Sequence, residues 1–210
     1  MRSGFVPVVG RPNVGKSTLV NALVGSKVSI TSKRPQTTRN TIRGVLTGDD
    51  FQIVFVDTPG LHKPRTALGS RLNQLVHGSL ADADVVLFVI DASGPIGPGD
   101  RRIAASLAES GTPVVVAVNK VDAASTSEIA EQLSTAAEWD FAAYVPVSAL
   151  TKDVTGIVDE LTVRLPEGPM FFPADAVTDQ PDKFLAGEII REKFLDRLRE
   201  ELPHSLAVAV

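Results

Sequence analysis

The sequence contains no cysteine. Disulfide bonds, thiolate nucleophiles and cysteine-ligated metal or iron–sulfur centres are therefore excluded, and a reducing compartment is compatible with the composition. Long apolar runs are missing too, since "VVLFVI" and "VVVAV" are far too short to cross a bilayer. The first apolar strand pattern follows the first residues so directly that no signal sequence fits before it, and we expect a cytoplasmic protein. A peripheral membrane association cannot be derived from the sequence.

An excess of basic residues is also lacking. The 210 residues include 21 lysine and arginine residues and 25 acidic ones, with a net charge of −4 and an isoelectric point near 5.4. This balance argues against electrostatic binding of nucleic acid by the chain as a whole, so RNA binding requires a local patch or a further segment. Apolar residues make up 43% and charged residues 22%, which indicates a globular protein.

Short apolar segments typical of buried strands alternate with amphipathic stretches of helical length. This alternation predicts an α/β fold with a mostly parallel sheet flanked by helices. Thr41–Thr47 and Phe51–Asp57 are joined by Gly48, Asp49 and Asp50, which predicts a hairpin with one antiparallel strand. With that hairpin the predicted sheet has six strands, and the remaining four are Phe5–Val9, Asp84–Asp91, Pro113–Asn119 and Ala143–Val147.

The pattern changes twice after residue 165. The segment 166–183 begins "PEGPMFF", contains prolines without a period and is predicted to be a surface linker, with Phe171 and Phe172 pinned against the main domain rather than serving as a docking site. Phe184–Leu202 has the apolar period of a helix that Pro203 ends, and "SLAVAV" predicts a strand. One helix and one strand cannot form a domain, so we expect residues 184–210 to be the start of a truncated one after a domain of residues 1–165.

The stretch "GRPNVGKST" matches the pattern G-x-x-x-x-G-K-[ST] between a predicted strand and a predicted helix, as in a P-loop NTPase. Glycines allow backbone N–H groups to surround a phosphate, Lys16 reaches the β- and γ-phosphate oxygens, and the Ser17 hydroxyl ligates Mg²⁺. The nucleotide-binding residues predicted in this loop are Gly10, Asn13, Val14, Gly15, Lys16, Ser17 and Thr18.

A second loop, "DTPG", follows the strand of the hairpin that is predicted to lie beside the first strand. Asp57 has the position of a second Mg²⁺ anchor that acts through a water molecule, and Gly60 can offer its N–H to a γ-phosphate. Such an N–H finds its partner only in the triphosphate state, which is the behaviour of a switch. The histidines share no metal-ligand spacing, so we propose no second metal site at His62, His77 or His204.

The stretch "NKVD" indicates which base is bound. Asp122 can accept hydrogen bonds from the N1–H and 2-amino groups of guanine, Asn119 can bond the base and tie loops together, and the Lys120 stem can cover the ring. Adenine lacks the matching donors, so the carboxylate would face a lone pair. The loop "SAL" is predicted to bring a backbone N–H to guanine O6, and its residues are Ser148, Ala149 and Leu150.

The polar and basic stretch Thr31–Arg43 has no helical or strand period. We expect Thr37 or Thr38, with Thr38 preferred, to supply a hydroxyl to Mg²⁺ and an N–H to the γ-phosphate, so that the loop is ordered by GTP. The predicted metal ligands are Ser17, Thr38 and Asp57. The basic side chains of the loop either face a partner or are solvated, and they are Lys33, Arg34, Arg39 and Arg43.

Leu61 follows Gly60, where Ras-like enzymes have a glutamine that orients the attacking water. Leucine cannot do that, and Asn13 is the candidate for holding a K⁺ ion between the phosphates instead. The alternative is that Asn13 only tolerates an unusual backbone conformation. The residues predicted to take part in hydrolysis are therefore Lys16, Thr38, Gly60 and Asn13.

These motifs, together with "ITSKRPQTTRNTIRGV", "VDTPGLHKPR" and "FLAGEIIREKFLDRLREELPHS", resemble the Era family of bacterial ribosome-assembly GTPases, of the TrmE-Era-EngA type. The resemblance implies a switch that binds GTP and GDP, hydrolyses GTP and assists maturation of the small ribosomal subunit. It also implies a C-terminal KH domain that binds the 3′ end of 16S rRNA. KH domains grip RNA through a GXXG loop, which does not occur after Phe184, so RNA binding by these residues alone is not expected.

Two alternatives from other classes stay open. One is a P-loop kinase or ATPase, which Asn119, Lys120 and Asp122 disfavour. The other is a binding module in which GTP sets the shape presented to a partner, with negligible turnover.

Overall fold

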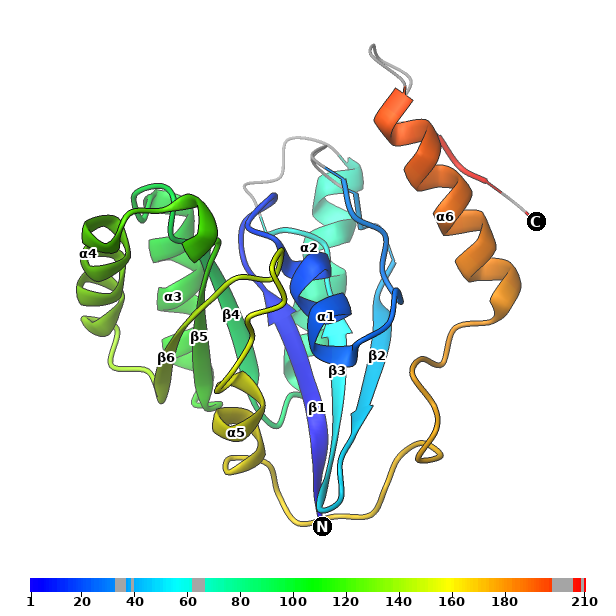
Figure 1. Cartoon of the computed structure of the whole chain (residues 1–210), viewed down its shortest axis with the longest axis horizontal. Helices are drawn as coiled ribbons and strands as arrows, with labels where there is room; N and C mark the ends of the chain where they lie inside the picture. The colour runs from blue at the N-terminus through cyan, green and yellow to red at the C-terminus, as the bar shows by residue number, and fades with distance from the viewer. Residues whose placement is uncertain (33–36, 39, 62–66, 198–205, 209) are drawn as a thin grey trace.

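The computed structural model describes residues 1–210 except 33–36, 39, 62–66, 198–205 and 209. Within the described residues, six strands form one sheet in the order β2-β3-β1-β4-β5-β6, in which only β2 runs antiparallel to its neighbour (Figure 1). The predicted α/β fold with a mostly parallel six-stranded sheet and an antiparallel hairpin strand is thereby confirmed. The strands are β1 (Arg2–Val9), β2 (Ile42–Thr47), β3 (Phe51–Asp57), β4 (Val86–Asp91), β5 (Val114–Asn119) and β6 (Ala143–Val147).

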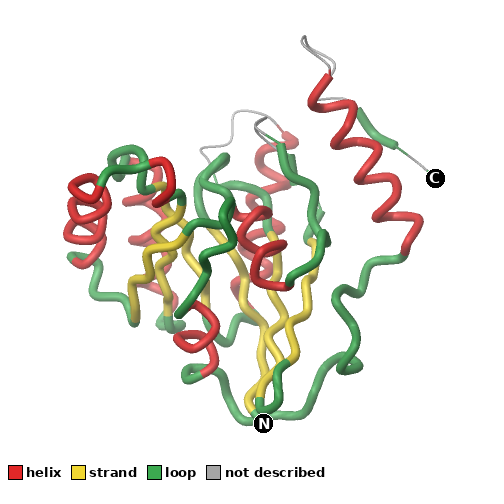
Figure 2. Tube along the Cα trace, viewed as in Figure 1, coloured by secondary structure: helices red, strands yellow, loops and turns green. Residues whose placement is uncertain are grey.

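Helices cover both faces of the sheet (Figure 2), which explains why the central strands are apolar at nearly every position. Apolar residues of α1 (Lys16–Val24) and α5 (Ile157–Thr162) share one core cluster, and those of α2 (Ala67–Ala81), α3 (Pro98–Ser110) and α4 (Thr126–Ala137) share the other. Because β3, β1, β4, β5 and β6 are parallel, their carboxyl ends meet at one edge of the sheet. Ligands of open α/β sheets bind at this edge.

The linker predicted over residues 166–183 lies against the sheet and reaches its β2 edge (Figure 1). The side chain of Gln52 is fully buried and bonds the backbone of the linker three times: its Oε1 accepts from Phe171 N at 2.7 Å and Phe172 N at 3.0 Å, and its Nε2 donates to Phe172 O at 2.9 Å. The ring of Phe171 lies 4.9 Å from that of Phe5. Phe171 is still 46% exposed, so it is packed on one side only.

The linker then pairs with β2 and leads into α6 (Asp182–Arg197). Val45 N donates to Val177 O at 2.9 Å, and Arg43 forms an ion pair with Asp179 at 2.7 Å. The part of the predicted helix beyond residue 197, up to residue 202, lies outside the described residues. Residues 206–208 and 210 are described without regular secondary structure, and residues 205 and 209 lie outside the described residues, so the strand expected at "SLAVAV" stays a prediction.

In the described part of the chain, no helix combines the length and the apolar character needed to cross a membrane.

Candidate nucleotide-binding site

A cavity of about 690 Å³ opens at the carboxyl edge of the sheet. It extends from the phosphate loop, around Lys16, to the loop after β5, around Asp122. Most of the predicted nucleotide-binding residues line it: Asn13, Gly15, Lys16, Ser17, Thr18, Thr38, Gly60, Asn119, Lys120, Asp122, Ala149 and Leu150. The sequence motifs, which are separated by up to 130 positions, from Thr18 to Ser148, therefore converge on one site.

The phosphate loop joins β1 to α1 through backbone conformations that favour glycine. Gly10 has φ +152° and Gly15 has φ +97°, and a Cβ atom at Gly15 would lie 2.3 Å from Asn119 Nδ2. Asn13 also adopts a left-handed conformation, with φ 66°. Asparagine tolerates this region better than most residues, which is the backbone property that the alternative explanation of Asn13 requires.

Lys16 is a buried cation whose ammonium group contacts backbone oxygens. Its Nζ donates to Gly10 O at 3.2 Å and to Arg11 O at 2.9 Å. Burial lowers the pKa of Lys16 to about 8, although the nearby Asp57 carboxylate acts in the opposite direction. A buried ammonium group with only neutral carbonyl partners is well suited to receive an anionic ligand such as a phosphate.

Asp57 is the second unusual charge in the site. Its side chain is fully buried, and neither carboxylate oxygen has a hydrogen-bond partner of normal geometry among the described residues. Burial raises the pKa of this carboxyl, and the hydroxyl of Ser17 and the charge of Lys16 oppose that rise. An orphaned buried carboxylate beside two hydroxyl groups, from Ser17 and Thr38, fits a hard divalent cation.

A metal at this point would not be held by protein carboxylates and imidazoles alone. The described residues contain no cluster of three or more histidine, aspartate or glutamate side chains that could ligate a metal. The remaining ligands would have to be hydroxyl groups, water and oxygens of the nucleotide, as is usual for Mg²⁺ bound with a phosphate compound.

The loop after β3 lies directly against the phosphate loop. Leu61 N donates to Gly10 O at 3.0 Å, and a Cβ atom at Gly60 would lie 2.7 Å from Pro12 N. Thr58 Oγ1 also donates to Val8 O at 2.7 Å. Gly60 is thus placed beside the phosphate loop in a space too narrow for any larger residue.

Asn119 connects three loops. Its Nδ2 donates to Val14 O at 2.8 Å, and its Oδ1 accepts from Ala149 N at 3.0 Å. Asp122 accepts a hydrogen bond from Ser148 Oγ at 2.5 Å, so the loop after β6 also supports the carboxylate. The N–H groups of Ser148 and Ala149 already have protein partners, Asp153 O and Asn119 Oδ1 respectively.

The structure separates the two candidate threonines of the loop before β2. The Thr38 side chain is buried, with its Oγ1 3.0 Å from Ser17 Oγ. Thr37 also lines the cavity, but it is half-buried, and its carbonyl oxygen accepts from Arg191 Nη2 of α6 at 2.6 Å. This geometry favours Thr38 as the metal ligand.

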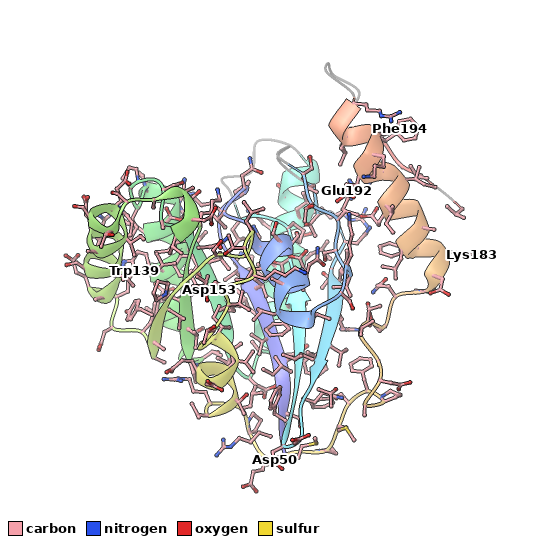
Figure 3. The ribbon with its side chains drawn as sticks, in the orientation of Figure 1. Asp50, Trp139, Asp153, Lys183, Glu192 and Phe194 are labelled. Atoms are coloured by element: carbon pink, nitrogen blue, oxygen red, sulfur yellow. The ribbon has the colours of Figure 1, made fainter. Side chains whose placement is uncertain are left out.

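Helix α6 also contacts the loop before β2 at Thr31, nearer the start of that loop. Glu192 accepts from Thr31 N at 2.8 Å and from Thr31 Oγ1 at 3.2 Å, and it forms an ion pair with Lys27. Figure 3 shows Glu192 near the body of the protein, whereas Phe194 lies on the helix with its side chain 48% exposed. Sequence reasoning missed these contacts, as it missed the pairing of Lys120 with Asp91, the last residue of β4.

Other residues singled out in the sequence lie elsewhere. Gly10, Val14 and Ser148 are each hydrogen-bonded to a residue that lines the cavity. Arg43 is paired with Asp179, and His77 is exposed on α2. The basic and histidine side chains considered as candidates that lie outside the described part are Lys33, Arg34, Arg39, His62 and His204.

The mostly parallel sheet, the phosphate loop and the base-recognition motif "NKVD" together define a P-loop GTP-binding protein. Residues 5–120 match the family model described as "50S ribosome-binding GTPase". The chain is 52% identical to GTPase Era of Mycobacterium avium over 214 residues, covering 100% of this chain and 72% of that protein. GTPase Era of Mycobacterium tuberculosis is likewise 52% identical, covering 99% of this chain and 71% of that protein.

Solved structures agree with these relatives. An Aquifex aeolicus Era variant bound to GDP.AlF4⁻ matches 98% of this chain and 71% of that chain, with a TM-score of 0.92 and 39% identity. Era in complex with MgGDPNP and nucleotides 1506–1542 of 16S ribosomal RNA matches with the same TM-score, 0.92, and 39% identity, covering 98% of this chain and 70% of that chain. The chain belongs to the Era family of GTPases and is a GTP-hydrolysing enzyme. This membership removes the kinase and ATPase alternative.

Proposed function

We propose that this GTPase is a Mg²⁺-dependent switch that assists maturation of the small ribosomal subunit. The nucleotide part is supported by one observation above all: a single cavity joins Lys16 to Asp122, and the orphaned Asp57 carboxylate is buried close to Lys16. The ribosomal part is supported by the family and by the related Era structure solved with 16S ribosomal RNA.

The phosphate end is assigned to residues of three loops. Lys16 would contact the β- and γ-phosphates, the Ser17 and Thr38 hydroxyls would ligate Mg²⁺, and Asp57 would hold it through water. Mg²⁺, when bound, neutralises charge on these phosphates. The Gly60 N–H recognises the γ-phosphate, and backbone groups of the phosphate loop bind the remaining oxygens. Gly10, Asn13, Val14, Gly15 and Thr18 form or adjoin that loop.

The base end is assigned to the loops after β5 and β6. Asp122 accepts from the N1–H and 2-amino groups of guanine, and Asn119 keeps the base loops and the phosphate loop together. Lys120 covers one face of the ring. Ala149 and Leu150 line this end of the cavity, where Leu150 is 76% exposed, and Ser148 supports it by donating to Asp122.

The three-part division of the chain is retained as a proposal: a G domain over residues 1–165, a linker over 166–183 and a KH-type segment from residue 184. The sequence holds no Gly-x-x-Gly after Phe184. We therefore expect that these 210 residues alone do not distinguish the 3′ end of 16S rRNA from a scrambled oligonucleotide, which filter or fluorescence binding tests directly.

The test of the catalytic part is phosphate release from GTP and from ATP by the purified chain with Mg²⁺. Release from GTP only, abolished by Lys16→Ala, supports the proposal. GTP binding without measurable release would favour the binding module with negligible turnover instead.

The test of the ribosomal part is depletion of the protein in the organism that encodes it. We expect 16S rRNA with unprocessed ends to accumulate and mature small subunits to decline, with rescue by the parent gene and not by the Lys16→Ala gene. Normal 16S processing after depletion would overturn the ribosomal role and leave the GTPase assignment intact.

A further inference from the structure

Asp91 is placed by the sheet next to the base-binding loop. It is the last residue of β4, and the parallel pairing with β5 sets it opposite Asn119. Ala92 N donates to Asn119 O at 2.7 Å, so the chain stays attached to β5 just beyond the strand. A carboxylate at this position is within reach of the residue after Asn119, which is Lys120.

The two oxygens of Asp91 have separate partners. Lys120 Nζ lies 2.5 Å from Asp91 Oδ2, whereas Oδ1 accepts from Ser93 N at 3.0 Å and from Ser93 Oγ at 2.6 Å. Ser93 therefore fixes the orientation of the carboxylate, and the carboxylate fixes the ammonium group. Burial by itself would raise the pKa of Asp91, but the hydrogen bonds from Lys120 and Ser93 outweigh it and hold this pKa below its usual value.

Lys120 is restrained at its backbone as well. Its φ of 69° lies in the left-handed region, which a residue other than glycine rarely adopts unless the surrounding structure imposes it. Its side chain lines the nucleotide cavity and remains 35% exposed. With both ends fixed, the methylene stem of Lys120 has little conformational freedom before a ligand arrives.

We propose that Asp91 is a positioning residue for the nucleotide base: it holds the Lys120 ammonium at the end of β4, so that the Lys120 stem is already placed to cover one face of the guanine ring. This inference rests on the function proposed above. A free lysine side chain has many rotamers, and the entropy lost on fixing it opposes binding. The ion pair with Asp91 removes that cost from the binding step.

The face and the edge of the base are recognised by different residues. Contact with the Lys120 stem depends on the ring face, which guanine and hypoxanthine share, whereas Asp122 recognises the 2-amino group that hypoxanthine lacks. Loss of Asp91 should therefore weaken GDP and inosine diphosphate equally. Damage that spread to Asp122 or Asn119 would weaken GDP more.

The test compares dissociation rates of GDP and inosine diphosphate from the parent and from Asp91→Asn, which keeps an oxygen for Ser93 and removes the charge. We expect both rates to rise about fivefold, with their ratio unchanged, and the effect to shrink at high salt because the pair is partly exposed. Ser93→Ala removes only the hydroxyl bond and keeps both the Ser93 N–H bond to Asp91 Oδ1 and the Lys120 pair, so it is the matched control, with rates within about twofold of the parent. Unfolding temperatures verify that each variant is folded.

A double-mutant cycle with Lys120→Met completes the test, because methionine keeps most of the stem without the charge. Asp91→Asn should add nothing in that background. Unchanged rates in Asp91→Asn, a changed ratio of the two nucleotides, or full additivity with Lys120→Met would each overturn the positioning role. A folded parent that binds neither nucleotide would instead overturn the proposed function itself.

Discussion

The hydroxyl oxygens of Ser17 and Thr38 lie 3.0 Å apart. Adjacent oxygen ligands of an octahedral Mg²⁺, at about 2.1 Å from the metal, are separated by about 3.0 Å. The two hydroxyl groups are hydrogen-bonded to each other at a separation that two ligands of one such ion would also have, beside a carboxylate, Asp57, that has no hydrogen-bond partner among the described residues. The phosphate loop and the loop before β2 therefore meet at a point prepared for a small hard cation.

The first prediction concerns this pair. Ser17→Ala and Thr38→Ala each remove one ligand, so we expect the Mg²⁺ concentration for half-maximal GTP hydrolysis to rise at least about tenfold. Thr37→Ala is the control, because Thr37 contacts α6 through its backbone carbonyl, and its Mg²⁺ dependence should match the parent. A stronger effect of Thr37→Ala than of Thr38→Ala would reverse the assignment.

The second prediction concerns the base. In Asp122→Asn the amide presents a donor where guanine also has donors, so GTP affinity should fall at least about a hundredfold. Xanthosine triphosphate, whose C2 oxygen meets the amide donor, should bind better than GTP. Competition against a fluorescent nucleotide measures both affinities. Asp140→Asn makes the same chemical change at an exposed position and should leave the preference for GTP intact.

The third prediction concerns pH. The pKa of Lys16 in the free protein is about 8, so its ammonium group loses its proton as the pH rises through that value. Nucleotide phosphates favour the charged form and raise this pKa on binding, so binding takes up a proton above pH 8. GDP affinity should be constant well below that pH and fall above it, by up to about tenfold per pH unit.

Calorimetry at pH 8.5 in two buffers of different ionisation enthalpy measures the proton uptake. Lys16→Arg, whose guanidinium stays charged, should show none. Absence of uptake by the parent would refute the titration of Lys16 in this range.

The fourth prediction concerns the monovalent cation. Leu61 cannot orient water, so we expect GTP hydrolysis to be faster in K⁺ than in Na⁺ at equal ionic strength, with the side-chain oxygen of Asn13 helping to hold the ion. Asn13→Ala should lose the preference. Asn13→Gly separates the two explanations of Asn13, because glycine accepts φ 66° and lacks the side-chain oxygen. Retention of the K⁺ preference in the glycine variant would assign Asn13 a backbone role only.

The sheet and the nucleotide-binding motifs could be predicted from the sequence because both depend on local patterns of residues. The buried segments around Val114–Asn119 are apolar throughout, and the phosphate loop is contiguous. The hydrogen bond from Arg191 to Thr37 and the ion pair of Lys120 with Asp91 could not be predicted, because each contact depends on how distant parts of the chain come together at the site. The strand expected at "SLAVAV" stays a prediction, because strand propensity gives a strand only where a partner strand is available.

Gln52 has a consequence for where the domain can be cut. Its buried amide is bonded to backbone groups of residues 171 and 172, so a protein ending at residue 165 would exchange those hydrogen bonds for bonds to water and lose about 0.5–1.5 kcal/mol for each. The pairing of Val45 with Val177 would also be lost, and β2 would become an open edge. A fragment that keeps the Gln52 amide paired and β2 covered therefore extends beyond the last nucleotide-binding loop to at least residue 178.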